Sequence, residues 1–375
     1  MKLFAVAQPG LEEATYRELK ELNINGNVVP GGVEFEGDLK EIYLTNLWLR
    51  TASRILLRLC SFRAKHFGEL VRKATKCNWE NYITPELSIK IRVTSRKSKL
   101  YHTKAIEERI LKAIAEKLGF QPKLAKYEDE GTSVIVRFEK DICTISVNTS
   151  GAMLHKRGYR VAETEAPIRE NIAAAMIILS NWDKRTPFID PFCGSGTIPI
   201  EAALLAANIP PGINRTFAFM KWKNFDLALW EEIKKEAENK RKEITVPIFG
   251  FDIDPKAVEA AEKNAKAAGV SKYIGFKQAS FPFLSIKKAT VITNPPYGER
   301  LKIRRTKLLY VHFGDWIRSN FSECEAYFIT DKVSFAKSVS ENVEEITNFS
   351  NGGIKVRLYR YRWEKEKGEV QNESF

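Results

Sequence analysis

The chain of 375 residues contains little cysteine and no long apolar run. Its five cysteines are widely spaced and form no Cys-x-x-Cys pair, which argues against a disulfide framework and against a zinc site. The longest apolar stretch, residues 172–179, is far shorter than the roughly 20 residues of a membrane span. The first ten residues also lack the apolar run of about 7 to 15 residues of a secretory signal. The sequence therefore predicts a cytoplasmic chain that binds neither metal nor membrane.

Acidic residues are the minority among the charged ones. The chain has 47 Asp+Glu against 60 Lys+Arg, a formal net charge of +13, and residues 61–150 hold more than half of this excess. Positive charge favours a polyanionic partner such as nucleic acid, because neutralising phosphates releases counterions. A hydrophobic fraction of 44%, with 22 Phe, 12 Tyr and 7 Trp, is enough to build packed cores and excludes wholesale disorder.

The N-terminal part predicts two small units. In residues 1–62 the pattern indicates two helices and three strands, at 10–22, 39–48, 2–7, 32–35 and 54–62. In residues 63–150 it indicates helices and strands at 68–75, 104–118, 87–94, 132–138 and 142–148. A basic cluster lies between strand 87–94 and helix 104–118 and comprises Arg92, Arg96, Lys97, Lys99, His102 and Lys104. This cluster is either a solvated loop or a contact for RNA phosphates.

A linker and then a larger domain follow. Residues 151–166 combine glycines with Lys156, Arg157 and Arg160 beside Tyr159, which is typical of a linker. From residue 167 helices and strands alternate, with helices at 167–180, 198–207, 255–269 and 307–320 and strands at 187–190, 246–253, 273–277, 290–293 and 325–329. Repeated strand–helix–strand units predict a doubly wound parallel sheet. Such sheets bind ligands at the carboxyl ends of their strands.

The first motif at a strand end is PFIDPFCGSGT. An apolar strand ends in Asp190, and Gly194 and Gly196 precede an apolar helix. Glycines let the backbone approach a ligand closely, and the helix start offers free N–H groups. A P-loop is excluded because GK[ST] is missing, and a dinucleotide fingerprint because the third glycine is missing.

The second motif, FDIDP, supplies a carboxylate at the end of another strand. Asp252 is the candidate for accepting hydrogen bonds from two ribose hydroxyls. Asp254 precedes Pro255 at a helix start, which is typical of ordinary N-capping.

The third motif is Asn294-Pro295-Pro296-Tyr297, directly after the apolar strand 290–293. Consecutive prolines leave backbone carbonyls without regular partners. An Asn oxygen and a proline carbonyl can together accept both hydrogens of an NH2 group, while the Tyr ring stacks on the base. The competing interpretation is that these residues form an ordinary structural turn. Their position directly after a buried strand argues against it.

With these motifs the sequence resembles the class I S-adenosylmethionine-dependent methyltransferases that act on amino nitrogens. DPFCGSGT resembles their cofactor loop, FDIDP their ribose-binding acid and NPPY their amino-methylation signature. Further segments, GGVEFEG, NLWLRTASRILLRL, LHKRGYR and APIRENIAAAMI, are similar to the THUMP-containing RNA guanine-N2 methyltransferases, nearest to the bacterial 23S ribosomal RNA (RlmL-like) branch. This resemblance covers essentially the whole chain.

The resemblance implies an α/β fold, a Rossmann-like doubly wound methyltransferase domain preceded by small α+β domains. The expected domains are a ferredoxin-like domain, a THUMP RNA-binding domain, a linker and the methyltransferase domain, at residues 1–62, 63–150, 151–166 and 167–375. It implies catalytic roles for Asn294, Pro295, Pro296 and Tyr297. It implies that S-adenosyl-L-methionine is held by Asp190, Pro191, Cys193, Gly194, Gly196, Thr197, Asp252, Ile253, Ser280 and Asn294. RNA contacts are expected at Arg96, Lys97, Lys99, His155, Lys156 and Arg157.

One position departs from the family pattern. Many relatives carry an acidic residue that holds the adenine amino group, where this chain has Ala279-Ser280. Either Ser280 accepts that hydrogen bond more weakly, or a backbone group replaces it.

The reaction that the resemblance implies is methylation of N2 of an unpaired or flipped guanine in 23S ribosomal RNA. A guanine near the acceptor stem of tRNA is the main alternative, and adenine N6 in DNA also suits an NPPY site. From another class, the chain could be a non-catalytic RNA-binding assembly factor. A cysteine-nucleophile pyrimidine methyltransferase is disfavoured because Cys193 lies in the cofactor loop. The aromatic and basic segment 214–230 either flanks the substrate or is an insertion packed on the sheet.

Overall fold

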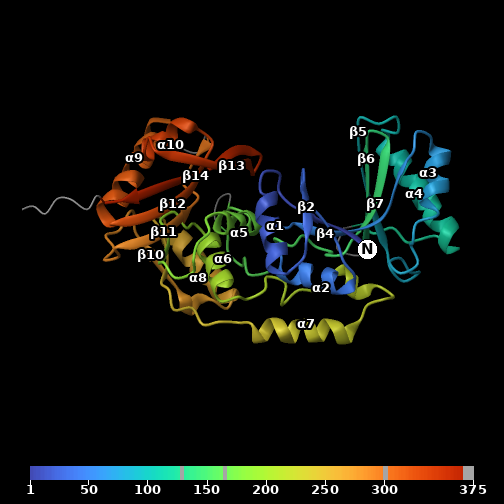
Figure 1. Ribbon diagram of the computed structural model, residues 1–375, viewed down its shortest axis with the longest axis horizontal. Coiled ribbons are helices and arrows are strands. Elements are labelled where there is room, and N and C mark those ends of the chain that lie inside the picture. Colours follow the sequence, from blue (N-terminus) through green and yellow to red (C-terminus); the bar gives the residue numbers. More distant parts are fainter. Residues whose placement is uncertain (127–130, 164–166, 299–302, 366–375) are drawn as a thin grey trace, which may run out of the picture. The chain divides into compact units, whose positions relative to one another are not determined.

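The computed structural model describes residues 1–126, 131–163, 167–298 and 303–365 (Figure 1). These residues form two compact units, each with its own seven-stranded sheet. The first unit contains residues 1–8, 15–156 and 210–239. The second contains residues 9–14, 157–209 and the chain from residue 240 onward. The chain therefore passes between the units several times.

The sheet of the first unit joins the two predicted N-terminal domains. Its strand order is β2-β3-β1-β4-β7-β6-β5. The strands are β1 (Lys2–Val6), β2 (Gly26–Val29), β3 (Gly32–Glu36), β4 (Arg54–Arg63), β5 (Ile89–Arg96), β6 (Thr132–Glu139) and β7 (Ile142–Asn148). Among these strands only β5 and β6 pair in parallel. Because β4 pairs with β7, the ferredoxin-like and THUMP parts share one continuous sheet.

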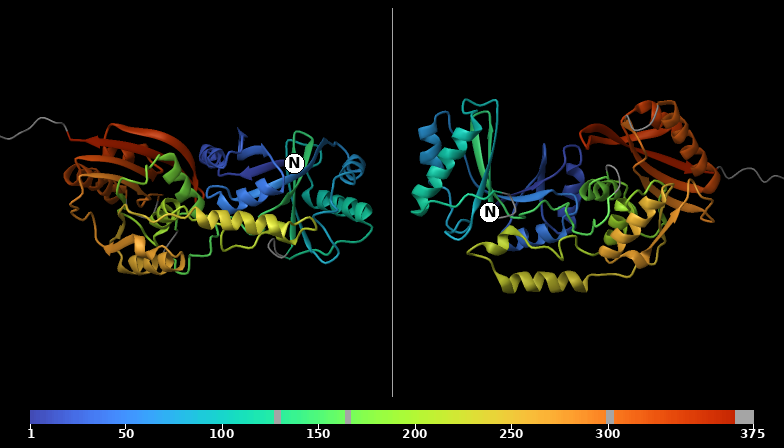
Figure 2. Two further views of the ribbon diagram at one scale, coloured as in Figure 1. Left: turned by 60° about the horizontal axis from the view of Figure 1, so that its bottom comes forward. Right: turned by 180° about the vertical axis from the view of Figure 1, so that it is seen from behind.

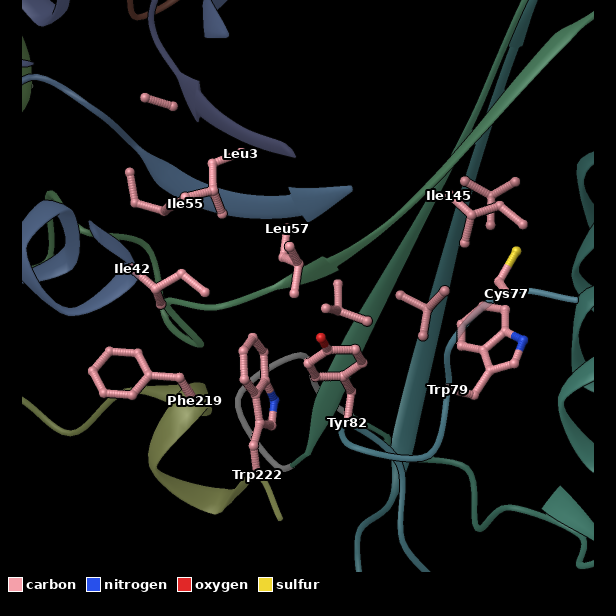
Figure 3. Packing of buried hydrophobic residues seen from close by; sticks show 14 of the residues in the cluster. Leu3, Ile42, Ile55, Leu57, Cys77, Trp79, Tyr82, Ile145, Phe219 and Trp222 are labelled. Carbon is pink, nitrogen blue, oxygen red and sulfur yellow. The ribbon is translucent and has the colours of Figure 1, made fainter. Parts of the chain in front are cut away.

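Helices cover one side of this sheet. They are α1 (Glu12–Glu21), α2 (Leu39–Trp48), α3 (Phe67–Ala74), α4 (Thr103–Leu118), the short 3-10 helix η1 (Ala218–Lys221) and α7 (Leu227–Asn239). The α2 helix begins at a capping box: Asp38 accepts from the Lys40 N–H, and Glu41 accepts from the Asp38 N–H, both at 2.8 Å. Alternate strand residues such as Leu3, Ile55 and Leu57 point into the apolar core beneath the helices (Figure 3).

The segment 210–239 packs into this N-terminal core, although the sequence analysis placed it within the methyltransferase domain. The Phe219 ring stacks on Tyr43 of α2 at 4.6 Å, and Trp230 of α7 meets Tyr43 edge-on at 5.9 Å. Phe219 and Trp222 lie in the same core as Leu3 and Ile42 (Figure 3). The aromatic residues of this segment are thus core residues of an insertion, the second of the two predicted alternatives.

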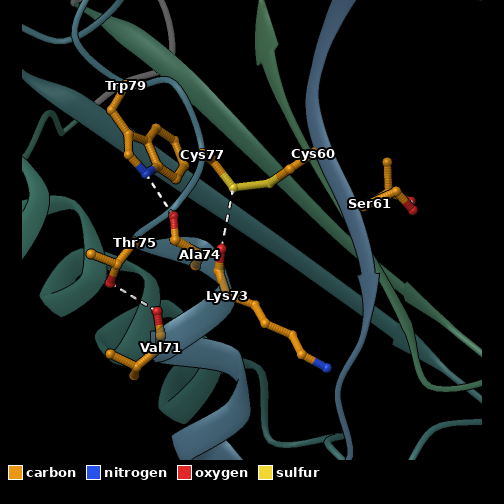
Figure 4. The surroundings of a disulfide bond; sticks show 9 residues. Cys60, Ser61, Val71, Lys73, Ala74, Thr75, Cys77 and Trp79 are labelled. Carbon is orange, nitrogen blue, oxygen red and sulfur yellow. Dashed lines mark hydrogen bonds between the residues drawn. A yellow bond between two sulfur atoms is a disulfide. The ribbon is translucent and has the colours of Figure 1, made fainter.

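A disulfide joins Cys60 of β4 to Cys77, which follows α3 (Figure 4). The expectation of cysteines without disulfides is therefore wrong for this pair. The packing of α3 against the sheet brings the two Cα atoms to 5.8 Å, a distance that the spacing along the sequence does not reveal. Cys143, Cys193 and Cys324 are free and buried.

The second unit is the predicted doubly wound sheet, with the order β10-β9-β8-β11-β12-β14-β13. Its strands are β8 (Phe188–Asp190), β9 (Ile248–Asp252), β10 (Ile274–Gln278), β11 (Lys288–Thr293), β12 (Glu323–Thr330), β13 (Val343–Asn351) and β14 (Ile354–Glu364). The first five are mutually parallel, whereas β14 and β13 form an antiparallel hairpin that the sequence analysis did not predict. The strand order reverses between β8 and β11, which makes this pair the topological switch point.

Helices lie on both faces of the second sheet (Figures 1 and 2). They are α5 (Glu170–Leu179), α6 (Thr197–Ala206), α8 (Pro255–Ala267), the 3-10 helix η2 (Ser271–Tyr273), α9 (Ile303–Asn320) and α10 (Val333–Val339). Phe188 and Ile292 point toward α5, α6 and α8, whereas Ile189 and Val291 point toward α9 and α10. This confirms the predicted α/β fold with a buried sheet. Among the described helices, none is both long and apolar enough to cross a membrane.

The packing of segment 210–239 can be tested with Phe219→Ala. Removing this fully buried ring is expected to lower the free energy of unfolding of the first unit by about 3–5 kcal/mol. Hydrogen exchange should then accelerate in β1, β3 and β4 but not in β8 and β11. Phe283→Ala, at a side chain that is 84% exposed, serves as the control and should change neither. Faster exchange confined to β8 and β11 would contradict this assignment.

Candidate active site

Two hydrogen bonds link the three motifs at one edge of the second sheet. The β8 strand lies between β9 and β11, so Asp190, Asp252 and Thr293 end three neighbouring strands. Thr293 Oγ1 donates to Asp190 Oδ1 at 2.5 Å, and the Gly194 N–H donates to Asp252 Oδ2 at 2.9 Å. The first bond joins the ends of β11 and β8 directly, and the second joins the glycine loop that follows β8 to the end of β9.

The glycine loop 191–196 connects β8 to α6 in a conformation that suits glycine. Gly194 and Gly196 have φ angles of +53° and +83°, which L side chains rarely adopt. A Cβ on Gly196 would also come within 2.9 Å of the Ala261 Cβ on α8. The loop therefore lies close to α8 and presents backbone and the start of α6 at the strand ends. Pro191 begins the loop and Thr197 follows it, and both are buried.

Cys193 in this loop is buried, and burial raises the pKa of its thiol well above the ordinary value. The neighbouring carboxylates Asp190 and Asp252 raise this pKa further. A thiol of this kind is a poor nucleophile. Cys193 therefore lies in the glycine loop with a thiol that is poorly suited to nucleophilic attack.

Asp252 and Asp254 have different roles. Asp252 accepts from the Gly194 N–H and, at 3.0 Å, from the Asp254 N–H. A carboxylate offers about four acceptor positions, so Asp252 can still accept from ribose hydroxyls. Asp254 caps α8 by accepting from the Lys256 N–H at 2.9 Å, as the sequence predicted.

The side chains next to Asp252 form an open, partly apolar border. Ile253 is 71% exposed at the end of β9, and Ser280 is exposed after β10. The Ala279 N–H donates to the Asp252 carbonyl at 2.9 Å, which holds the two strand ends together. An exposed aliphatic side chain at such an edge suits the flat face of a purine.

The Asn294-Pro295-Pro296-Tyr297 segment follows β11 at the switch point. The Asn294 Oδ1 atom is buried and has no hydrogen-bond partner in the described structure. Pro295 is buried as well, and the Pro296 carbonyl accepts from Tyr310 of α9 at 3.4 Å. An unsatisfied buried acceptor costs about 1–3 kcal/mol, so Asn294 is suited to a ligand that brings a donor.

Tyr297 differs from the expected stacking surface. Its ring is only 7% exposed and packs in the apolar core of the second unit. Its hydroxyl accepts from Asn351 Nδ2 on β13 at 2.6 Å. In this structure Tyr297 therefore anchors the segment to the β13–β14 hairpin, which the sequence analysis had not predicted. Residues 299–302, which follow the motif, lie outside the described part.

Asp190 is a buried carboxyl at the centre of the site. Burial raises its pKa to about 7, although hydrogen bonds from Thr293 and from the Phe192 N–H act in the opposite direction. Its Oδ2 atom is buried and has no hydrogen-bond partner in the part of the chain that the structure describes. A second orphaned polar atom thus lies on the strand adjacent to Asn294.

Asn264 of α8 was not singled out from the sequence, yet it holds the glycine loop. Its Oδ1 accepts from the Val161 and Ala162 N–H groups at 2.8 and 2.9 Å. Its Nδ2 donates to the Ala162 and Ser195 carbonyls at 2.9 and 3.0 Å. Because Asn264 is 1% exposed and uses its donors and acceptor fully, it ties residues 161–162 to the glycine loop.

Part of the predicted linker, residues 157–160, packs in the second unit. Arg157 and Glu201 form an ion pair at 3.4 Å with side chains 3% and 0% exposed, and Tyr159 donates to the same Glu201 at 3.0 Å. Arg160 pairs with Glu170 at 2.9 Å and donates to Thr197 at 3.2 Å. Buried charges require such partners. The prediction that residues 151–166 form a linker is therefore wrong for Arg157, Tyr159 and Arg160.

The candidate RNA-binding residues fall into two groups. Arg96, Lys97 and Lys99 are exposed at the end of β5 and the following loop, and Lys156 is exposed as well. The prediction of an RNA contact is wrong for Arg157, because its guanidinium is buried against Glu201 and is not available to a phosphate. His155 is half-buried. No cluster of His, Cys, Asp and Glu that could hold a metal occurs among the described residues.

These features define a Rossmann-like S-adenosylmethionine-dependent methyltransferase. They are a doubly wound sheet, a glycine loop after β8, the carboxylate of Asp252 at the end of β9 and the Asn-Pro-Pro-Tyr segment after β11. Comparison with known families agrees. Residues 157–360 match the family described as "RMKL-like, methyltransferase domain", residues 2–56 the "RlmL ferredoxin-like domain" and residues 64–148 the "THUMP domain". The chain belongs to this family of THUMP-containing, RMKL-like methyltransferases.

Individual relatives extend the match over the whole chain. YpsC of Bacillus subtilis is 37% identical, and the alignment covers 97% of this chain and 96% of YpsC. "Ribosomal RNA large subunit methyltransferase K/L" of Cellvibrio japonicus is 32% identical over 96% of this chain, which spans about half of that relative. The crystal structure of SMU.472 complexed with S-adenosylhomocysteine (SAH) has a TM-score of 0.89 and 34% identity, covering 98% of this chain and 99% of SMU.472.

Asp252→Ala tests the cofactor site. Losing a charged acceptor for the ribose and for the Gly194 N–H is expected to weaken S-adenosylmethionine binding about 10- to 100-fold, measured by calorimetric titration. Asp254→Ala is the matched control: it removes only a helix cap, so it should cost about 1 kcal/mol of stability and leave the Kd nearly unchanged. Equal losses of affinity in both variants would argue against a specific role of Asp252.

Proposed function

We propose that this chain transfers a methyl group from S-adenosylmethionine to the exocyclic N2 amino group of a guanine in RNA. The observation that carries the proposal is the buried Asn294 Oδ1, which finds no hydrogen-bond partner among the described residues and lies at the switch point beside the loop that Asp252 holds. A substrate amino group would supply the missing hydrogen bond. The proposal includes a cytoplasmic location and a 23S ribosomal RNA target.

The Asn294 side chain and the Pro295 carbonyl would accept the two hydrogens of the substrate amine. This arrangement favours a pyramidal nitrogen and directs its lone pair out of the plane of the base. When bound, the cofactor supplies an electrophilic sulfonium methyl group. Neither Asn294 nor Pro295 has to titrate, and positioning of this kind can contribute about 7–11 kcal/mol. The proton released from the amine leaves to water.

Residues around the motif keep it fixed for this task. Before Asn294 in the chain, Thr293 is hydrogen-bonded to Asp190. After it, Tyr297 is hydrogen-bonded to Asn351. An acceptor held by its neighbours on both sides loses little conformational entropy when substrate binds. A base paired in a helix cannot present its N2 there, so the substrate guanine would be unpaired or flipped.

Ribosomal RNA as substrate is supported by the names of the large-subunit relatives and by the positive charge of the N-terminal unit. The chain spans about half of the length of the K/L relatives. A THUMP domain match and the exposed cations Arg96, Lys97 and Lys99 agree with an RNA substrate.

Asn294→Ala is expected to reduce methyl transfer at least about 100-fold, because a single positioned partner of the reacting group is worth this much. Cofactor affinity should stay within a few-fold of the wild type, since Asp252 and the glycine loop are intact. Asn294→Asp keeps an acceptor oxygen and should retain more activity than the alanine variant. Near wild-type turnover of Asn294→Ala would refute the proposed role.

The substrate is tested by incubating the chain with tritiated S-adenosylmethionine and total RNA from cells lacking this methyltransferase. The expected product is N2-methylguanosine in the large ribosomal RNA fraction. Label in tRNA would instead support the acceptor-stem alternative, and N6-methyladenine would overturn the guanine assignment. No label in any RNA, with cofactor bound, would indicate a non-catalytic RNA-binding factor.

A further inference from the structure

The first unit's sheet has one face that its own helices leave uncovered. Strand residues alternate between faces, and Ala5, Val136 and Ile145 point into the core beneath the helices. Their neighbours Phe4, Arg137 and Thr144 therefore point to the opposite side. In Figure 1, α3 and α4 lie on one side of β5, β6 and β7, and the first unit places no described helix on the other side.

This uncovered face carries arginines from three strands. The pairing register puts Arg58 of β4, Arg137 of β6 and Arg92 and Arg96 of β5 on the same side. We call these four residues the arginine face. Arg92, Arg96 and Arg137 are exposed. The register also puts Lys2 on this side, together with three acidic residues, Glu34, Glu36 and Glu139. The face therefore has a positive excess across both the ferredoxin-like and the THUMP parts.

A hollow of about 450 Å³ lies on this face. Its lining combines cations with apolar groups and includes Phe4, Pro30, Arg58, Arg96, Arg137 and Ile142. The Arg58 guanidinium lies 4.6 Å from the centre of the Phe4 ring and pairs with Glu34 at 2.5 Å, so it is held in place. Arg137 pairs with Glu139 at 3.3 Å, whereas Arg96 has no ion pair among the described residues.

We propose that this hollow binds an unpaired stretch of the RNA substrate, with Arg96 and Arg137 on its phosphates and the exposed Pro30 and Ile142 beside a base. Phosphates pair with guanidinium groups, and bases stack on guanidinium planes and on apolar rings. A duplex keeps its bases inside, so it would leave the apolar lining unused. The inference rests on the proposed function, because it assumes that RNA is the substrate.

The helix side of the same strands offers a matched control. Arg72 of α3 and Lys112 of α4 are exposed and belong to the same unit. Replacing them by glutamine removes two positive charges, as Arg96→Gln with Arg137→Gln does on the uncovered face. The lost pairs, Arg137 with Glu139 and Lys112 with Glu116, are surface pairs of little consequence for stability. The two double variants therefore differ chiefly in the face that they neutralise.

The experiment measures how the affinity of the full chain for a fluorescent 12-nucleotide single-stranded RNA depends on salt. For Arg96→Gln with Arg137→Gln, the slope of log K against log salt should fall by about 1.4, since each phosphate contact with a single strand contributes about 0.7. The Arg72→Gln, Lys112→Gln variant should keep the wild-type slope. Arg96→Lys with Arg137→Lys should restore most of it.

Three results would overturn the inference: an unchanged slope, equal losses in both glutamine variants, or an equal loss with a blunt RNA duplex. Competition by a poly-glutamate peptide as strong as that by single-stranded RNA would assign the face to an acidic protein partner instead. Methyl transfer to RNA by the wild-type chain is measured in parallel. Its absence would refute the proposed function, whereas normal transfer with an unchanged slope would refute only the RNA-binding hollow.

Discussion

The site depends on one adjacency, the parallel pairing of β8 with β11 at the point where the strand order reverses. It brings the buried Asp190 carboxyl against Thr293 and places Asn294 at the same edge as the glycine loop. Without this pairing, the loop that suits the cofactor and the segment that suits an amine would lie on unrelated parts of the chain. Asp190 and Asn294 each carry a buried oxygen that has no hydrogen-bond partner among the described residues, and leaving such an atom unsatisfied costs stability.

Buried polar contacts within the second unit hold the glycine loop and the helices next to it in position. Asn264 holds the Ser195 carbonyl of the loop, and Glu201 and Glu170 hold Arg157 and Arg160. These contacts bring residues 157–162 into the methyltransferase unit, and the family match also begins at residue 157. The segment that connects the domains is thus also part of the support for the cofactor loop.

The first unit is built from two sequence domains on one sheet, closed by an insertion that comes from far along the chain. The pairing of β4 with β7 and the stacking of Phe219 on Tyr43 make it a single body. A continuous sheet can carry a continuous surface, so charges from β4, β5 and β6 gather on one face although they come from both sequence domains.

Short-range patterns in the sequence determined much of the fold and of the candidate site. Strand-to-helix turns with glycine, an N-capping Asp254 and an Asn-Pro-Pro-Tyr segment behind an apolar strand are short-range patterns, so the alternating fold and the three motifs could be predicted from the sequence. Contacts between distant segments could not. The Cys60–Cys77 disulfide, the burial of Arg157 against Glu201, the bond between Tyr297 and Asn351, and the place of segment 210–239 were decided by the tertiary structure. Charge and aromatic character show that a residue needs a partner, but only the packed chain decides whether that partner is solvent, ligand or another part of the protein.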